Sequence, residues 1–504
     1  MDVKPLVRPT TLVVAALVTI AAGADTPELV EAAKNGQRAA ALALVNGKTD
    51  VRAQASDGTT ALHWAARQDD LELAERLLEG GADPSVTNRY GVTPLYLAAL
   101  NGSAAMLARL LDAGASADEV GNEGETVLMT AARTGRVEAA RLLLENGADI
   151  DAREHWHGQT ALMWASAQGH PEMIRELLAH GADVNARSNI EEWERPVTAE
   201  PRAKWLPPGG MTSLLFAARE GCVACIEVLV EGGADVNVTT PDGISAIVSA
   251  LINGHYDVAA KLIAAGTDPN LIDSAGRGAL YAAVDFNTMP NSNRPSPQVL
   301  ENEHSALDII ELLLEQGADA NARLERLAPY RAKLDRGNDT VLGAGTTPLL
   351  RAAKAGDVAA MRTLLANGAD PAATTERGVN GLMLAAGLGT TEQDTTGRYK
   401  TEAEAIEAID ILLATGLDID AADARGRTAL HGAALQGFDA VVKALAERGA
   451  ALDSKDNDGY TALDTALGLA GGWGFAGQDS VVQASTAELL RELMGIVPAT
   501  AQGQ

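Results

Sequence analysis

The stretch "GTTALHWAARQDDLELAERLLEGGAD", residues 58–83, contains two amphipathic patterns separated by a polar turn. Thr60 can cap a first helix, in which the apolar residues of 62–66 recur at the spacing of one helical face. Leucine and alanine within 73–78 mark a second amphipathic helix, which ends at Gly80 and Gly81 because glycine tolerates the left-handed cap conformation. Neither short helix can bury its apolar stripe alone, so the stretch predicts helix pairs that stack on neighbouring copies.

The same frame recurs along the chain with a period of 33 residues. Where the gap between copies is longer, it equals one period plus an insertion. The glycines that correspond to Gly58 are Gly91, Gly124, Gly158, Gly210, Gly243, Gly276, Gly345, Gly378, Gly426 and Gly459. Counting back one period from Gly58 reaches Asp25, so a further copy is expected to begin there.

These copies resemble the ankyrin repeat family. The matching helix starts are Thr60-Ala61-Leu62-His63, Thr93-Pro94-Leu95-Tyr96, Thr347-Pro348-Leu349 and Thr428-Ala429-Leu430-His431, and the matching ends include Gly147-Ala148-Asp149 and Gly233-Ala234-Asp235-Val236-Asn237. The resemblance implies an all-α fold, an ankyrin-repeat solenoid of about twelve helix-turn-helix repeats with hairpin fingers and several inserted loops. His63 and His431 match a histidine that has a structural role in this family. The fold implies a binding function in general, without indicating a particular ligand.

Composition limits the classes of function. Hydrophobic residues make up 46 % of the chain and aromatic residues only 3 %, so the core must be built from Ala, Leu, Val and Ile. The formal net charge of −28 is spread along the chain and would repel a nucleic-acid backbone. We therefore expect no nucleic-acid partner.

The first residues read as a secretory signal peptide, 1–24. Lys4 and Arg8 precede an apolar run at 12–22, and Ala22-Gly23-Ala24 forms a small-residue cleavage pattern. An uncleaved membrane anchor is the alternative. No later segment is apolar for about 18 residues, so no membrane span is expected in the mature chain.

The mature chain is expected to comprise the solenoid, 25–496, and a short tail, 497–504. Abundant Ala, Gly and Arg hint at a bacterial source, so the protein is expected in the periplasm or the extracellular space. Insertions between repeats, on the finger side, are expected at about 188–209 and 323–344, and insertions between the two helices of one repeat at about 286–304, 387–401 and 468–484. The last three occupy the eighth, tenth and twelfth repeats, so they should line one edge at alternate steps.

Departures from the repeat template indicate where a partner binds. Trp156 lies at a finger tip, where an apolar ring has little local reason to exist. Trp193 and Trp205, in the first insertion, either close over the binding site or pin their own loop, whereas Trp64 and Trp164 occupy a framework position that favours packing. The candidate contacts on the concave face are Tyr90, Arg133, Trp156, His157 and Arg219, with Trp193 and Trp205 above them.

A cysteine pair and a histidine pair are the remaining candidates for a disulfide or a metal site. Cys222 and Cys225 are three residues apart at the start of a helix, so they either form a local disulfide or serve as a turn residue and a buried spacer. His155 and His157 resemble a metal pair but lack further ligands at a suitable spacing, and no metal or cofactor is expected.

The function that the sequence favours is a non-catalytic, monomeric scaffold that binds another protein through its concave face and inserted loops. Two alternatives stay open: an enzyme whose hydrolytic or redox pocket is built from the insertions, and a secreted effector that acts on a host protein.

Overall fold

The computed structural model describes residues 26–190, 209–288, 302–326, 341–389, 400–470 and 481–496. The described residues form 24 helices in twelve consecutive pairs, with isolated β-bridges and no extended strand among them. This confirms the all-α solenoid of about twelve helix-turn-helix repeats. The chain divides into two compact units, unit 1 over residues 1–156 and unit 2 over residues 157–504, and we describe each separately.

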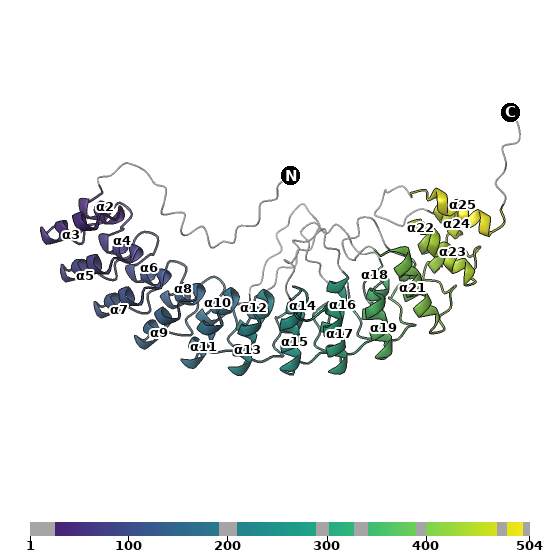
Figure 1. Ribbon diagram of the computed structural model, residues 1–504, viewed down its shortest axis with the longest axis horizontal. Coiled ribbons are helices and arrows are strands. Elements are labelled where there is room, and N and C mark those ends of the chain that lie inside the picture. Colours follow the sequence, from purple (N-terminus) through teal and green to yellow (C-terminus); the bar gives the residue numbers. More distant parts are fainter. Residues whose placement is uncertain are drawn as a thin grey trace, which may run out of the picture. The chain divides into compact units, whose positions relative to one another are not determined.

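Unit 1 contains four repeats (Figure 1). Their first helices are α2 (Glu28–Lys34), α4 (Ala61–Gln68), α6 (Pro94–Asn101) and α8 (Val127–Thr134), and their second helices are α3 (Arg38–Asn46), α5 (Leu71–Glu79), α7 (Ala104–Asp112) and α9 (Val137–Glu145). The predicted signal peptide, 1–24, lies outside the described residues.

Unit 2 contains eight repeats (Figure 1). Its first helices are α10 (Ala161–Gln168), α12 (Ser213–Glu220), α14 (Ala246–Leu251), α16 (Ala279–Asn287), α18 (Pro348–Ala355), α20 (Gly381–Ala385), α22 (Ala429–Gln436) and α24 (Ala462–Ala466). Its second helices are α11 (Pro171–Ala179), α13 (Val223–Glu231), α15 (Tyr256–Ala264), α17 (Ala306–Glu315), α19 (Val358–Ala366), α21 (Glu402–Leu413), α23 (Asp439–Glu447) and α25 (Ala484–Leu493). Most residues of the five predicted insertions lie outside the described ranges.

Local sequence determines where the first helices begin and end. A hydroxyl side chain precedes most of them and accepts the N–H of the third helical residue, as Thr93 Oγ1 does from Tyr96 N at 3.1 Å. Six of the first helices end at a glycine in the left-handed conformation: Gly102, Gly135, Gly169, Gly221, Gly356 and Gly437. In α4 the same position is held by Asp69, with φ of 57°.

Within each unit, first helices pack on first helices and second helices on second helices. Paired alanines such as Ala65 and Ala66, or Ala98 and Ala99, are at most 1 % exposed, which allows the helices to approach closely. Leucines on the inner side of the second helices, including Leu77 and Leu143, are fully buried. The core is therefore one continuous row of Ala and Leu side chains in each unit.

Successive fingers are joined by a ladder of backbone hydrogen bonds. Arg89 N donates to Asp57 O at 2.9 Å, and His155 N donates to Glu123 O at 3.0 Å. In unit 2 the same bond joins Ser274 to Asp242, Glu325 to Ala275, Glu376 to Ala344, Ala424 to Arg377 and Asn457 to Arg425. The eleven glycines of the repeat frame all have positive φ, which glycine adopts without strain, and they form the turns of these fingers.

Candidate functional site

Two sets of positions are candidates for contact with a partner, although several members of the second set are themselves buried. The first set is the fingers that precede the first helices. The second set, called the first-helix face below, consists of the fourth and seventh residues of each first helix. Its members include Trp64 and Arg67 in α4, Leu97 and Leu100 in α6, Thr130 and Arg133 in α8, Trp164 and Ala167 in α10, Phe216 and Arg219 in α12, Ala282 and Asp285 in α16, and Arg351 and Lys354 in α18.

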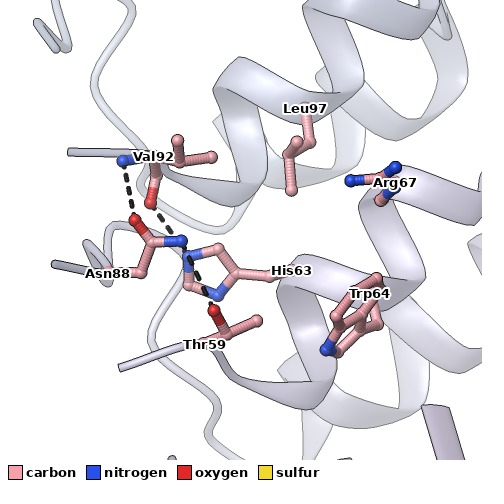
Figure 2. A pocket seen from close by; sticks show the side chains of 7 residues that line it. All are labelled: Thr59, His63, Trp64, Arg67, Asn88, Val92 and Leu97. Carbon is pink, nitrogen blue, oxygen red and sulfur yellow. Dashed lines mark hydrogen bonds between the residues drawn. The ribbon is translucent and has the colours of Figure 1, made fainter. Parts of the chain in front are cut away.

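His63 organises the start of α4. Its Nδ1 accepts from Thr60 N at 3.1 Å, so the proton lies on Nε2, which donates to Val92 O in the next repeat at 3.0 Å. Figure 2 shows the His63 ring beside Thr59 and Asn88. The side-chain amide of Asn88 donates to Thr59 Oγ1 and accepts from Val92 N, so it joins the two neighbouring fingers. Burial lowers the pKa of His63, against the opposing effect of the hydrogen bond to Val92, so the ring is neutral near pH 7. The structure thus places His63 in a structural network.

Beside His63, a shallow hollow opens between α4 and α6 (Figure 2). Its lining residues are Thr59, His63, Trp64, Arg67, Asn88, Val92 and Leu97. The guanidinium of Arg67 lies 5.7 Å from the Trp64 ring centroid, within range of a cation–π interaction. Trp64 is half-buried, so it both packs in the framework, as predicted, and presents part of its ring to the hollow.

The other two predicted contacts of unit 1, Tyr90 and Arg133, differ in how deeply their side chains are buried. Tyr90 is half-buried on its finger, and the Arg89 guanidinium lies 4.7 Å from its ring. Arg133 is mostly buried: its side chain is 18 % exposed and its Nη2 lies 3.3 Å from Glu125 Oε1. Arg133 is therefore tied into its own repeat, and Tyr90 is the more accessible of the two.

Trp156 is a strongly exposed predicted contact, with 68 % of its surface accessible. Its backbone N–H donates to Glu154 Oε2 at 2.6 Å, and the Glu154 side chain is buried in the finger. The finger is thus rigidly built while its ring projects outward. This arrangement suits a contact residue, because an exposed aromatic ring on a fixed backbone loses little entropy when it is covered.

In unit 2, His157 is exposed, and its carbonyl accepts from Asn189 N at 2.6 Å. Arg219 is exposed on α12, 5.1 Å from the Phe216 ring, and its Nε donates to Glu220 Oε1 at 3.1 Å. Trp193 and Trp205 lie outside the described residues, so their predicted position above the site stays a prediction.

Three further apolar side chains on the fingers were missed by the sequence analysis. Val120, Ile190 and Ile272 are 57 %, 61 % and 48 % exposed. Val120 and Ile272 occupy the same place, four residues before the finger glycine, where most other repeats carry a polar residue such as Gln54, Thr87 or Lys455. A comparison of that one position across the repeats would have identified both of them.

The first-helix face changes character in α16 and α18 of unit 2. Arg351 is 1 % exposed and its Nε donates to Asp285 Oδ1 at 2.5 Å. Lys354 is 4 % exposed, and Lys400, 2 % exposed, donates to Lys354 O at 2.9 Å. The ammonium of Lys400 therefore lies against the last carbonyls of α18, where the helix dipole favours a cation.

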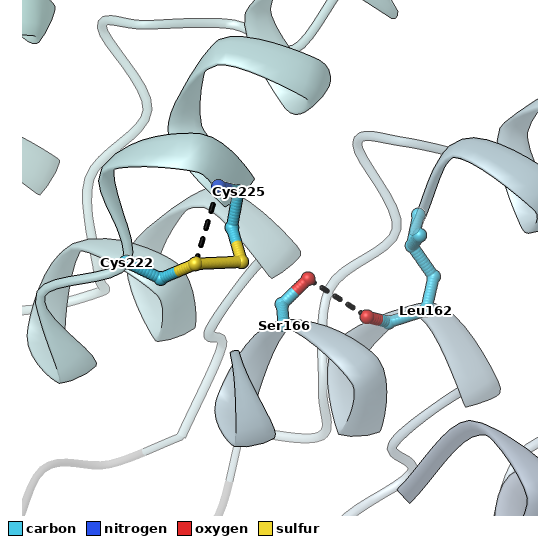
Figure 3. The surroundings of a disulfide bond; sticks show 4 residues. All are labelled: Leu162, Ser166, Cys222 and Cys225. Carbon is cyan, nitrogen blue, oxygen red and sulfur yellow. Dashed lines mark hydrogen bonds between the residues drawn. A yellow bond between two sulfur atoms is a disulfide. The ribbon is translucent and has the colours of Figure 1, made fainter. Parts of the chain in front are cut away.

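The disulfide alternative for the two cysteines is the one found in the structure. Cys222 and Cys225 are bonded, with Cα atoms 5.2 Å apart (Figure 3). Cys222 is the N-cap residue of α13, and Cys225 is fully buried in the first turn of that helix.

The described residues contain no group of three or more His, Cys, Asp or Glu side chains placed to hold a metal ion. Among the same residues, none of the helices is both long enough and apolar enough to cross a membrane.

The buried histidines make a testable contribution to pH dependence. Burial lowers the pKa of both His63 and His431, while the unfolded chain titrates near 6.5. Below that pH the unfolded state binds more protons, so stability should be highest above pH 6.5 and fall as the pH is lowered through this range. Urea denaturation at pH 7.5 and 5.5 would measure the decline.

The matched control replaces both histidines with methionine, which already occupies the corresponding position as Met129 and Met163. The double variant should lose most of the decline between these two pH values. An unchanged decline would show that other groups cause it.

Comparisons with known proteins agree with this architecture. A family model described as three copies of the ankyrin repeat matches residues 29–120, 106–188, 214–323 and 400–472, and a single ankyrin repeat matches residues 344–376. The chain is 30 % identical over 191 residues to the ankyrin repeat and KH domain-containing protein mask-1 of Caenorhabditis elegans, covering 35 % of this chain and 6 % of that protein. It is 30 % identical over 172 residues to the mitochondrial disaggregase of Bos taurus, covering 34 % of this chain and 20 % of that protein.

Among solved structures, the human ASB11 ankyrin repeat domain is 27 % identical, with a TM-score of 0.39, and the match covers 48 % of this chain and 99 % of that domain. The chain thus spans only a small part of the two full-length relatives named above.

Proposed function

Because the chain belongs to the ankyrin repeat family, whose repeats serve as protein-interaction scaffolds, we propose that it binds a protein partner through its finger tips and first-helix face. The partner covers Trp156 and the other exposed apolar side chain on the fingers of unit 1, Val120. Binding takes place by contact alone, without chemistry at the site.

The observation that carries this proposal is the distribution of exposed apolar side chains. Nine large hydrophobic residues are exposed in the described part of the chain. Four lie on fingers, namely Val120, Trp156, Ile190 and Ile272, and the other five lie in the last repeat. Exposed apolar groups on rigid turns favour association, because covering them removes apolar surface from water.

Charge also bears on the partner. With a formal net charge of −28, the chain attracts basic proteins and repels acidic ones at low ionic strength. Arginines of the first-helix face lie beside aromatic rings, Arg67 half-buried and Arg219 exposed. Their guanidinium groups can donate hydrogen bonds to a carboxylate of the partner. We propose a partner with a basic surface that inserts apolar and acidic side chains among the fingers.

The export signal in residues 1–24 supports action in the periplasm or outside the cell. A photo-crosslinking amino acid at position 156, introduced in the native cell, would capture the partner and its compartment together. The same group at Glu79, an exposed residue at the end of α5, is the control. Crosslinks from position 156 in an exported fraction support the proposal, and equal capture from both positions would contradict it.

Replacing Trp156 with alanine should weaken binding of the captured partner by about 2 kcal/mol, or roughly 30-fold in Kd, because exposed tryptophans at interface centres are frequent hot spots. Titration calorimetry would measure the change.

Leu493→Ala is the matched control, since Leu493 is an exposed apolar residue in the last repeat. The Leu493→Ala chain should bind the partner with unchanged affinity. The Trp156→Ala chain should unfold at the same urea midpoint as the unmodified chain. An affinity unaffected by Trp156→Ala would remove this finger from the site.

A further inference from the structure

The disulfide at the start of α13 lies at a position where other repeats use an acceptor side chain. In α5, α7 and α19 the N-cap residue is Asp70, Ser103 or Asp357, and its side-chain oxygen accepts the N–H of the third helical residue. In α13 the same position is Cys222, whose Sγ accepts from Cys225 N at 3.2 Å (Figure 3). The sulfur thus replaces a carboxylate or hydroxyl oxygen.

This replacement has a chemical consequence. A thiolate at an N-cap accepts the same hydrogen bond with a full negative charge and lies at the positive end of the helix dipole. A disulfide sulfur at that position is a weak, neutral acceptor. Cleavage of the bond would therefore place a thiol, or its thiolate when ionised, at the cap position that the Asp70 carboxylate holds in α5.

The surroundings do not oppose a negative charge on the sulfur. The first turn of α13 contains no acidic residue, whereas α5, α9, α11 and α15 carry Glu72, Glu138, Glu172 and Asp257 there. Glu220, two residues before Cys222, lies 3.0 Å from Arg219. The ring of His255 lies against Gly221, so that a side chain added at Gly221 would overlap it.

The two sulfurs differ in accessibility. Cys222 is partly exposed in the turn beside Gly169, while Cys225 is 0 % exposed and packs toward α10, near Ser166 (Figure 3). Cys222, the more exposed residue of the pair, is therefore the one that an external thiol attacks. Cys225 is placed to act on Cys222 from within the protein, as the resolving partner.

We propose that Cys222 and Cys225 form a thiol–disulfide exchange site that acts on thiols of small molecules or proteins. An external thiolate attacks Cys222 Sγ, the Cys222–Cys225 bond breaks, and its electron pair goes to Cys225 Sγ, which takes a proton from solvent. A second external thiolate then attacks the sulfur of the first in the mixed disulfide. The Cys222 thiolate leaves, the two external thiols are oxidised to one disulfide, and the protein is reduced by two electrons.

The test uses the full chain and glutathione as the thiol. In Cys225→Ser, which removes the resolving sulfur, incubation with oxidised glutathione should give a stable mixed disulfide at Cys222, seen as one added glutathione by mass spectrometry. Cys222→Ser, with the buried sulfur alone, should give none while folded. Alkylation of Cys222 in the Cys225→Ser chain should be about tenfold faster than that of glutathione at pH 7, because more of it is thiolate.

Two controls separate this site from a structural disulfide. The first control is a chain in which Cys222 and Cys225 are replaced and Asp112→Cys is added. Its one cysteine lies at the exposed C-terminal end of α7, where the helix dipole disfavours a thiolate. This cysteine should be alkylated no faster than glutathione. A chain with Cys222→Asp and Cys225→Ala keeps an N-cap acceptor and should retain the helical signal in circular dichroism.

The proposal is overturned by an ordinary alkylation rate at Cys222, or by a native disulfide that resists millimolar reduced glutathione until the protein unfolds. Because the site lies apart from Trp156 along the chain, either result leaves the photo-crosslinking test of partner binding unaffected.

Discussion

Replacing Asp285 with alanine is expected to lower the free energy of unfolding by about 3–5 kcal/mol, because it removes a carboxylate that pairs with a buried cation. Arg351 is 1 % exposed and is the largest fully buried side chain in the described residues. The variant cannot bring that guanidinium into water without disrupting the packing of α16 on α18. Urea denaturation, followed by circular dichroism, would measure the loss.

The matched control is Glu407→Ala. Glu407 also pairs with an arginine of the neighbouring repeat, Arg362, at 3.0 Å, but the two side chains are 51 % and 60 % exposed. This substitution should change stability by less than about 1 kcal/mol.

A double variant, Asp285→Ala with Arg351→Met, should recover part of the loss, because it also removes the buried charge. A double variant less stable than Asp285→Ala would show that Arg351 stabilises the fold through its other interactions.

The second large effect is expected at Leu143 in α9. This side chain is 0 % exposed in a helix that packs on α7 and α8, so Leu143→Ala should cost about 2–5 kcal/mol through lost burial and the cavity that remains. The unfolding midpoint in urea would shift accordingly, with the helical signal at low urea unchanged.

Leu144 provides the comparison on the same helix. It follows Leu143 directly but is only half-buried, so Leu144→Ala should cost about 1 kcal/mol or less. Equal losses at both positions would mean that the helix is rotated relative to the structure described here.

Periodicity was sufficient to predict the architecture. The apolar stripe at 62–66, the cap at Thr60 and the glycines at 80–81 are local signals, and each appears in the structure at the expected residue. The same reasoning identified Trp156, because a finger tip does not require an aromatic ring for packing. The predictions of the helices and glycines are confirmed, because each depends on neighbours within one repeat, whereas the role of Trp156 as a contact stays a prediction.

Features that depend on distant residues were not accessible in this way. Asp285 and Arg351 are 66 residues apart, and their pairing requires knowing that α16 packs directly on α18 across an insertion. Likewise, sequence spacing allowed Cys222 and Cys225 to bond but did not show that Cys222 is the more exposed residue of the pair. The burial of Arg133 against Glu125 also depends on how the finger turns back toward α8.

Main-chain hydrogen bonds join successive fingers at most steps, so these fingers are held together in part without the side chains at their tips, and side chains such as Asn88 add to them. Residues at the tips can consequently be exchanged with little penalty to the framework. A library randomised at positions such as 90, 120 and 156 should stay folded in most members, which makes this chain a natural starting point for selecting new recognition specificities.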